Sequence, residues 1–479
     1  MMEAEASPMP LADHNTRIVA TIGPASEAQP VLRQMIEAGM NVARLNFSHG
    51  DFDGHRRVIE NVRAASDAAG RRVAIMADLS GPKMRIGRLA AEPIELKAGD
   101  PSTLTTDDIV GDARRVSVSF ARLPQVVKAG DLLSLNDGYV QLEVTGVRGA
   151  EVACRVRVGG ELRSRKGLNL PGIDLGAGAF TDRDRECLRF ALEHGVDAVS
   201  QSFVEGPGDV AAVREAARAL GHQPFVIAKI ERSRALDRID DILEAADGVM
   251  IARGDLGVEV PIERIAVVQK DITRRANLRA KPVITATQML ESMTAYRLPT
   301  RAEATDVANA ILDGSDCVML SAESATGAFP VEAVAMLARI ARAVEPTRRR
   351  TLVKERYADV DLIGRVRPEH LIALSIETSL EYLQPAAVFV PTETGVAARR
   401  IASLHLPVPV VAFSRHESTC RHLQLSYGVT AVHEAATPTP DSIRSWVHSH
   451  GLRGEFAILT QELPHGEQKS DHRMEIIHL

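Results

Sequence analysis

The sequence contains few aromatic residues and no excess of positive charge, and both shortages restrict the possible functions. Aromatic side chains make up 4% of the 479 residues, and the formal net charge at pH 7 is -6. Proteins that bind nucleic acids usually present a basic face, and those that bind single strands stack bases on aromatic rings. We therefore expect no nucleic-acid partner.

Cysteine and long apolar runs are also scarce. No two cysteines form a CxxC pair of the kind that holds zinc or a redox disulfide. No apolar run is long enough to span a bilayer, and residues 1–15 lack the basic and apolar segments of a signal peptide. These absences predict a cytoplasmic protein with reduced thiols and no membrane partner, in which residues 1–15 form a flexible tail.

From residue 17 onward, short apolar runs alternate with helical patterns. The helical patterns include 29–38, 182–194, 209–220 and 303–313. Alternation of strands and helices is typical of a parallel sheet, and eight strands with their helices predict a (β/α)8 TIM barrel formed by residues 16–83 and 171–344. The active site of such a barrel lies at the C-terminal ends of its strands. The eight predicted strands are 17–22, 41–45, 73–77, 197–202, 225–230, 248–252, 282–286 and 317–320.

Two further regions differ from this pattern. In residues 84–170, turn signals such as Asn136-Asp-Gly separate short runs of Val and Leu, which predicts an inserted small β-barrel domain. Its position in a loop at the mouth of the barrel suits a lid. Residues 345–479 begin with a linker and continue with a second set of strands and helices, which predicts a C-terminal α/β domain.

Polar residues recur at the same end of every predicted barrel strand. Lys229 and Glu231 are two residues apart, so on a strand both side chains point to the same side. With Asp255 after the next strand, this group indicates a divalent metal ion and a phosphorylated or carboxylate substrate. Any one of these residues alone is equally well explained by a salt bridge or a helix cap. The full set is Thr21, Arg44, Asn46, Asp78, Ser202, Lys229, Glu231, Asp255, Thr287, Ser321 and Glu323.

Seven longer stretches resemble the pyruvate kinase family. They occur in the family's order, from the first barrel strand to the last. The resemblance implies an interrupted barrel with a lid and a C-terminal domain, a cytoplasmic homotetramer, and transfer of the phosphoryl group of phosphoenolpyruvate to ADP, the last step of glycolysis. The stretches are IVATIGPAS (18–26), GMNVARLNFSHG (39–50), KGLNLPG (166–172), AKIE (228–231), ARGDLG (252–257), ATQMLESM (286–293) and PTRAE (299–303).

The resemblance also implies how the metal ion and the phosphoryl group are bound. Glu231 and Asp255 are expected to hold Mg2+ or Mn2+, because hard oxygen ligands suit these ions. Lys229 is expected to stabilise the transferring phosphoryl group, and Arg44 to add a forked contact to the same group.

Other residues are expected to bind the remaining parts of the substrates. The backbone N–H groups of Gly254 and Asp255, with the Thr287 hydroxyl, would bind the substrate carboxylate. Thr287 would also take part in the proton transfer to the enolate, through Ser321 and a water molecule. The residues expected to bind the nucleotide are Asn46, His49, Arg85 and Lys166.

A monovalent cation is expected to be unnecessary. K+-dependent relatives hold the ion with residues that resemble Asn46, Ser48, Asp78 and the carbonyl of Leu79, and they have Glu where this chain has Lys83. Two like charges about 4 Å apart cost about 4 kcal/mol at an effective dielectric constant of about 20. We therefore expect the Lys83 ammonium, accepted by Asp78, to replace K+. The alternative is that this long side chain points into solvent.

Two other functions compete with this interpretation. Lys229 also fits the Schiff-base lysine of a class I aldolase, another barrel enzyme. That chemistry needs a depressed lysine pKa, whereas a neighbouring Glu231 raises the pKa. A non-catalytic, metabolite-binding relative is the third alternative, but every charged role described above is filled.

Overall fold

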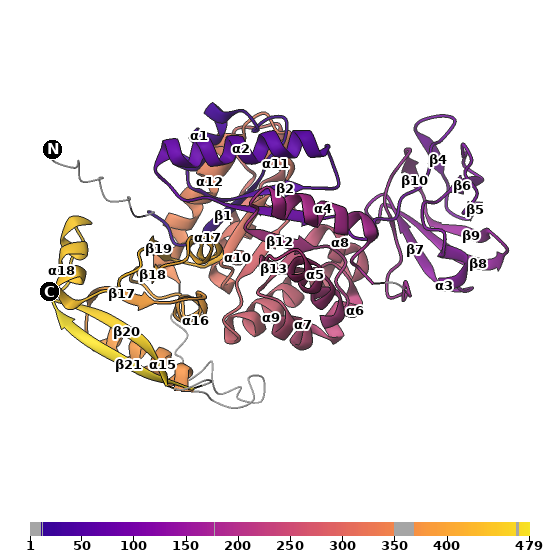
Figure 1. Ribbon diagram of the computed structural model, residues 1–479. Helices are drawn as coiled ribbons and strands as arrows, with labels where there is room; N and C mark the ends of the chain where they lie inside the picture. The colour runs from indigo at the N-terminus through magenta and orange to yellow at the C-terminus, as the bar shows by residue number, and fades with distance from the viewer. Residues whose placement is uncertain (1–10, 12, 177, 349–367, 466–468) are drawn as a thin grey trace.

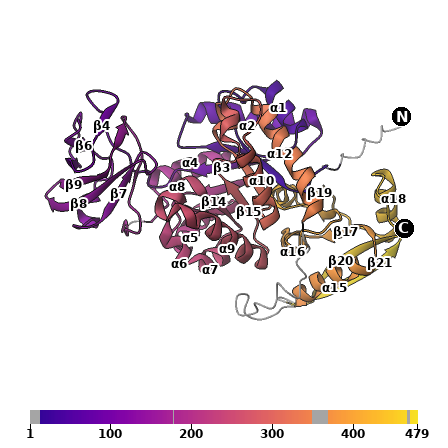
Figure 2. The same cartoon turned by 180° about the vertical axis from the view of Figure 1, so that it is seen from behind.

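The computed structural model describes residues 11, 13–176, 178–348, 368–465 and 469–479. A central barrel carries an all-β domain at one side and an α/β domain at the opposite side (Figures 1 and 2). Within the described residues, every helix is too short or too polar to cross a lipid bilayer.

Eight parallel strands close the barrel, as predicted. Each is mostly apolar and almost entirely buried, because one face of a barrel strand packs inside the barrel and the other packs against helices. Going around the barrel, the strands are β1 (Arg17–Thr21), β2 (Met40–Asn46), β3 (Ala74–Leu79), β12 (Ala198–Gln201), β13 (Phe225–Ile230), β14 (Gly248–Ala252), β15 (Val283–Ala286) and β16 (Cys317–Leu320).

Helices cover the outside of the barrel. Two of them begin two residues before the predicted position. In α10 the Thr300 hydroxyl accepts a hydrogen bond from the Glu303 N–H, which sets the helix start at Arg301; α5 begins on Pro207, a residue suited to a first helical turn. The helices are α1 (Gln29–Glu37), α2 (Phe52–Ala69), α4 (Asp182–Glu193), α5 (Pro207–Ala219), α6 (Ser233–Asp237), α7 (Ile239–Ala245), α8 (Arg253–Glu259), α9 (Ile265–Leu278), α10 (Arg301–Asp313), α11 (Ala322–Ala325) and α12 (Pro330–Val344).

The inserted domain has its own apolar core and contains a six-stranded and a two-stranded sheet. The predicted turn at Asn136-Asp137-Gly138 connects β7 to β8, and all three residues have positive φ, which Asn, Asp and Gly tolerate best. The elements are β4 (Ile94–Leu96), β5 (Pro101–Thr105), β6 (Arg115–Ser117), α3 (Leu123–Val126), β7 (Leu132–Leu135), β8 (Val140–Arg148), β9 (Glu151–Val158), β10 (Gly160–Leu162) and β11 (Leu168–Asn169).

The C-terminal domain is a five-stranded sheet with helices, as predicted. Only the first residues of the predicted linker are described, as a short 3-10 helix at Glu345–Thr347, and residues 349–367 lie outside the described part. The elements are α15 (Pro368–Tyr382), β17 (Pro385–Pro391), α16 (Val396–Ala402), β18 (Val410–Ser414), α17 (Glu417–His422), β19 (Val429–His433), α18 (Pro440–Ser449), β20 (Phe456–His465) and β21 (Lys469–His478).

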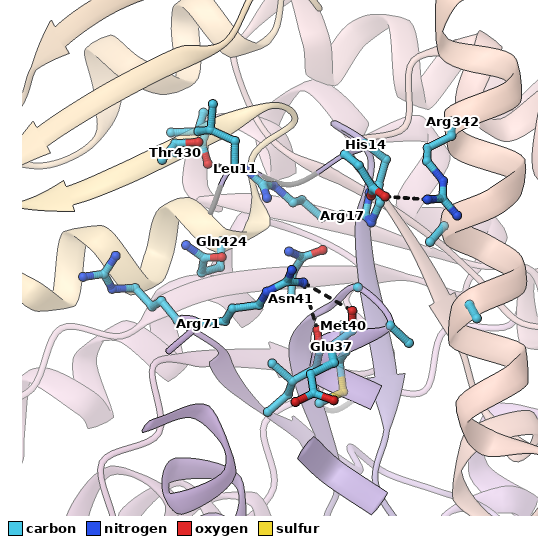
Figure 3. A pocket seen from close by; sticks show the side chains of 18 of the residues that line it. Leu11, His14, Arg17, Glu37, Met40, Asn41, Arg71, Arg342, Gln424 and Thr430 are labelled. Carbon is cyan, nitrogen blue, oxygen red and sulfur yellow. Dashed lines mark hydrogen bonds and ion pairs between the residues drawn. The ribbon is translucent and has the colours of Figure 1, made fainter. Parts of the chain in front are cut away.

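Arginine side chains fasten the barrel to the C-terminal domain. Arg17, at the start of β1, donates hydrogen bonds to the carbonyls of Ser426, at 2.8 Å, and Val429. Arg72 pairs with Glu417, with its Nε 2.9 Å from a carboxylate oxygen. Figure 3 shows a cavity of about 370 Å³ at this junction, into which side chains of β1, α12 and the C-terminal domain point.

The junction also buries a carboxylate. Asp316 lies directly before β16 and accepts hydrogen bonds from the backbone N–H groups of Val283, at 3.0 Å, and Tyr427, at 3.2 Å. Burial raises the pKa of Asp316 to about 7, although both N–H groups favour the charged form. Between about pH 4 and pH 7 the folded chain therefore retains a proton that the unfolded chain has lost.

This raised pKa predicts that protonated Asp316 stabilises the fold at low pH and that the contribution is lost as the pH rises through about 7. We expect Asp316→Asn, which stays neutral, to make the free energy of unfolding less dependent on pH between 5 and 7.5, by up to about 3 kcal/mol. Urea denaturation at several pH values measures this dependence. Asp441→Asn, at an exposed aspartate, should keep the wild-type slope. An unchanged slope in Asp316→Asn contradicts the prediction.

Candidate active site

The C-terminal ends of β3, β12 and β13 bring together a buried lysine and three oxygen-bearing side chains. The Lys229 Nζ lies 3.1 Å from Asp78 Oδ1 and 2.9 Å from Glu231 Oε1. It also donates a hydrogen bond to the Ser202 hydroxyl at 2.6 Å. Lys229 and Glu231 point to the same side, as the spacing of two residues predicted.

Asp78 is the shared partner of both cations at the site. The Arg44 Nε donates to Asp78 Oδ2 at 2.7 Å, and the Arg44 guanidinium also donates to the Thr21 hydroxyl at 2.8 Å. Burial raises the pKa of Asp78, but the Lys229 and Arg44 charges outweigh burial and hold the pKa below its ordinary value. An ionised Asp78 therefore fixes the positions of Lys229 and Arg44.

The surroundings of Lys229 keep its amine protonated. Burial alone lowers its pKa, but the carboxylates of Asp78 and Glu231 raise the pKa above the ordinary value of a lysine. A Schiff-base lysine must lose its proton to attack a carbonyl group. The geometry therefore argues against the aldolase alternative and favours a fixed positive charge.

Glu231 and Asp255 are the two residues expected from the sequence to hold a metal ion. The Phe203 N–H donates to Glu231 Oε2 at 2.8 Å, which orients the carboxylate. Burial raises the pKa of Glu231; Lys229 opposes this, and the nearby Asp255 charge adds to it. A divalent cation at these carboxylates would relieve their repulsion. In the described part of the chain no three or more His, Cys, Asp and Glu side chains form a metal-binding group. Mg2+ commonly takes several of its ligands from water and substrate phosphates.

The loop after β15 is hydrogen-bonded to the start of α8. The Gly254 N–H, expected to bind a substrate carboxylate, donates to the Thr287 hydroxyl oxygen at 2.7 Å. That hydroxyl in turn donates to the Ala286 carbonyl at 2.6 Å. Ser321 follows β16, and its N–H donates to the Glu323 carboxylate at 2.7 Å. Within the described residues no hydrogen bond joins Thr287 to Ser321, so their cooperation stays a prediction.

Arg253 binds the backbone of the loop after β15, a contact that we did not predict from the sequence. Thr287 and Gln288 have φ angles of 70° and 53°, a conformation that is strained for residues with a side chain. Arg253 donates to the Thr287 carbonyl at 2.7 Å and pairs with Asp306 at 2.7 Å. The ARGDLG stretch marked this arginine, but its spacing could not reveal which carbonyl groups the side chain reaches.

Positive charges gather on the side of the mouth that faces the inserted domain. Burial lowers the pKa of His49, and the charges of Lys83, Arg85 and Arg44 lower it further. Arg85 lies in the inserted domain, where the backbone of Lys166 pairs beside it: the Lys166 carbonyl accepts a hydrogen bond from residue 86 at 2.9 Å. Such a group of cations suits an anionic ligand.

The residues expected around a monovalent cation are also close to one another. The Asn46 Oδ1 accepts a hydrogen bond from the Ser48 N–H at 3.1 Å, and the Ser48 hydroxyl donates to Ser80 at 3.2 Å. Leu79 is buried at the end of β3, next to Asp78.

Lys83 differs from the expectation in its partner. Among the described residues it forms no ion pair with Asp78, whose oxygens are taken by Arg44 and Lys229. Burial and then the Arg85 charge lower the pKa of Lys83, while the carboxylates of Asp255 and Glu231 oppose this. The ammonium therefore lies in the field of Asp255 and Glu231, the two candidate metal ligands, rather than against Asp78.

Comparison with known proteins gives one consistent result. The models of the pyruvate kinase barrel domain and of the pyruvate kinase alpha/beta domain match residues 13–334 and 370–477. Pyruvate kinase of Thermococcus litoralis is 48% identical over 422 residues, 88% of this chain and 89% of the relative. Pyruvate kinase of Mycobacterium tuberculosis is 40% identical over 456 residues, 94% of this chain and 95% of the relative.

A solved structure agrees with the relatives. The crystal structure of a pyruvate kinase from Cryptosporidium parvum superposes with a TM-score of 0.88 at 34% identity, and the match covers 98% of each chain. Both the catalytic barrel and the C-terminal domain are therefore accounted for by the same family. The chain belongs to the pyruvate kinase family.

Proposed function

We propose that this chain transfers the phosphoryl group of phosphoenolpyruvate to ADP, which gives pyruvate and ATP in the last step of glycolysis. The observation that carries the proposal is the buried Lys229 ammonium, fixed between Asp78 and Glu231 at 3.1 Å and 2.9 Å. A fixed cation beside two candidate metal ligands suits phosphoryl transfer, in which catalysis consists mainly of positioning and charge stabilisation. Family membership over nearly the whole chain supports the same reaction.

In the transfer, the bond between phosphorus and the enol oxygen breaks and a bond to an ADP oxygen forms. Lys229 and Arg44 are proposed to contact the oxygens of the transferring group, where negative charge is spread in the transition state. Because Asp78 already holds both cations, little reorganisation is needed when the charge develops. The enolate that remains takes up a proton at carbon to become pyruvate.

Members of this family normally use a divalent metal ion. We propose Mg2+, or Mn2+ in its place, with Glu231 and Asp255 as the protein ligands. Bound there, the ion would supply positive charge that offsets the negative charge of the phosphoryl group.

The substrates occupy the surrounding positions in this proposal. The backbone N–H groups of Gly254 and Asp255 and the Thr287 hydroxyl face the carboxylate of phosphoenolpyruvate. For this, Gly254 must exchange its hydrogen bond with Thr287 for one with the substrate. Thr287 and Ser321 handle the enolate proton. The nucleotide is proposed to meet Asn46, His49, Arg85 and Lys166, and the cations near His49 support an anion there.

We further propose limits for the domains and a setting for the enzyme. The catalytic barrel comprises residues 16–83 and 171–344, the lid residues 84–170 and the C-terminal domain residues 345–479. The last residues of the predicted flexible tail 1–15 are instead packed: His14 is buried, and the Asn15 N–H donates to the Glu345 carboxylate at 2.9 Å. The separate apolar cores of the three parts support these limits. The enzyme is proposed to work in the cytoplasm as a homotetramer, in line with the family resemblance.

K+ is proposed to be unnecessary because Lys83 supplies the positive charge. Support comes from the nearby carboxylates of Asp255 and Glu231, which favour the charged form of Lys83, although burial and the Arg85 charge lower its pKa overall. In this proposal the ammonium acts without Asp78 as its partner, because Arg44 and Lys229 already pair with that carboxylate. A bound K+ nearby would be repelled by Lys83.

The proposed role of Lys229 predicts that Lys229→Met lowers kcat by roughly 10³-fold or more, because the lost charge acts mainly in the transition state. A coupled lactate dehydrogenase assay with phosphoenolpyruvate, ADP and Mg2+ measures kcat and KM, and circular dichroism checks folding. Lys97→Met, at an exposed lysine of the inserted domain, should match the wild type. A rise in KM with unchanged kcat contradicts the role of Lys229, and an inactive wild type refutes the function.

The proposed role of Lys83 predicts a flat K+ titration. With tetramethylammonium as the sole monovalent cation, we expect the wild type to have full activity and to respond less than about twofold to added K+. Lys83→Glu should become dependent on K+, because the new carboxylate attracts a cation. Lys97→Glu makes the same charge change at an exposed position and should remain independent of K+. Activation of the wild type by tenfold or more would end this proposal.

A further inference from the structure

The inserted domain is attached to the barrel by two crossings of the chain (Figure 1). The first follows β3, and the second returns from β11, which ends at Asn169, toward α4. Residues 170–173 of the return crossing lie against the barrel. Their backbone groups are bound by two buried side chains that the phosphoryl-transfer mechanism does not use, Arg232 and Glu259.

Arg232 binds the carbonyl groups of the return crossing. Its side chain is 2% exposed. One terminal nitrogen of the guanidinium donates to the Ile173 carbonyl at 2.7 Å and to the Leu170 carbonyl at 3.2 Å. The same nitrogen lies 3.3 Å from a carboxylate oxygen of Glu205. The buried Arg232 cation is thus held by two carbonyl oxygens of the return crossing and by the Glu205 carboxylate. We call residues 170–173 of the return crossing the hinge.

Glu259 binds the same segment with the opposite charge. One of its carboxylate oxygens lies 3.4 Å from the Arg232 Nε. The other accepts hydrogen bonds from the Gly172 N–H at 3.4 Å and from the Ser233 hydroxyl at 2.9 Å. The crossing is therefore held at two carbonyls by the arginine and at one amide by the glutamate.

Both members of this pair are joined to the candidate metal ligands by a short length of rigid chain. Arg232 directly follows Glu231 at the end of β13. Glu259 ends α8, and Asp255 lies four residues earlier in the same helix, about one turn away. A displacement of the return crossing that moves Arg232 or Glu259 must therefore be transmitted to the positions of the two carboxylates.

We propose that the Arg232–Glu259 pair couples the position of the inserted domain to the placement of Glu231 and Asp255. Arg232 is thus a positioning residue, and the inference rests on the proposed function through its assignment of the two metal ligands. Coupling of this kind is reciprocal: if the hinge orders the carboxylates, a metal ion bound by the carboxylates must order the hinge. This reciprocity separates the proposal from a role of Arg232 in packing alone.

A matched arginine is available at the opposite end of the barrel. Arg63 donates to the carbonyls of Val73, at 2.9 Å, and Gly195, at 2.7 Å, and pairs with the Asp197 carboxylate at 2.8 Å. It thus makes the same kinds of contact as Arg232, far from the hinge. Arg63→Met controls for the loss of a partly buried arginine and its hydrogen bonds.

The test uses Mn2+ alone, without substrates, and two measurements on the full-length protein. Hydrogen exchange followed by mass spectrometry reports on the amides of residues 168–176, and the paramagnetic resonance of free Mn2+ gives the affinity. We expect Mn2+ to slow exchange in this segment of the wild type and of Arg63→Met. In Arg232→Met the slowing should disappear, and the Mn2+ affinity should fall about tenfold. Arg232→Lys keeps the charge near Glu259 and should be intermediate.

Other results overturn the proposal. One is an Arg232→Met variant with wild-type slowing of exchange and with Mn2+ affinity within about twofold; another is a wild type whose hinge does not respond to Mn2+. If Arg232→Met fails to fold, Arg232→Lys is judged by the same two measurements, and wild-type behaviour there also overturns the coupling. Neither measurement uses phosphoenolpyruvate or ADP, so an inactive wild type refutes the proposed function without deciding the hinge.

Discussion

The site depends on the burial of one carboxylate, Asp78 on β3, between two cations: one from the adjacent strand β2 and one from β13, the second strand away on the other side. A buried charge is costly unless it is paired and hydrogen-bonded. Arg44 on β2 and Lys229 on β13 provide this pairing, with nitrogen-to-oxygen distances of 2.7 Å and 3.1 Å. Asp78 can remain charged only when the barrel closes in the correct register. The condition for folding at this point is thus also the condition for holding the two cations that are proposed to bind the phosphoryl group.

Two short segments that follow barrel strands each carry a candidate metal ligand and a residue that holds the hinge of the inserted domain. The segment after β13 provides Glu231 and then Arg232, and α8 provides Asp255 and then Glu259. A lid that must close over a substrate benefits from a hinge in contact with the residues that bind the substrate. The buried polar contacts of this hinge favour one arrangement of the crossing over many loosely packed ones.

Much of this architecture could be predicted because barrel strands are buried on both sides and therefore appear as short apolar runs. The polar residues at the ends of the runs marked one end of the barrel as the candidate active face, and the structure brings two of them, Lys229 and Glu231, into contact there. Contacts made by long side chains between loops were not predictable, since sequence spacing does not fix the partner. Arg253 was therefore missed, and Lys83 was assigned to Asp78, whose oxygens two nearer cations already occupy.

The most direct test of the central role of Asp78 is a double-mutant cycle on kcat/KM for phosphoenolpyruvate, with Asp78→Asn, Lys229→Met and the double variant. If Asp78 acts by holding the cations, Asp78→Asn alone should lower kcat/KM by about 10²-fold or more, and it should have much less effect when Lys229 is already absent. Circular dichroism would confirm that each variant is folded. Losses that simply add in the double variant, or an Asp78→Asn variant within about threefold of the wild type, would contradict this role.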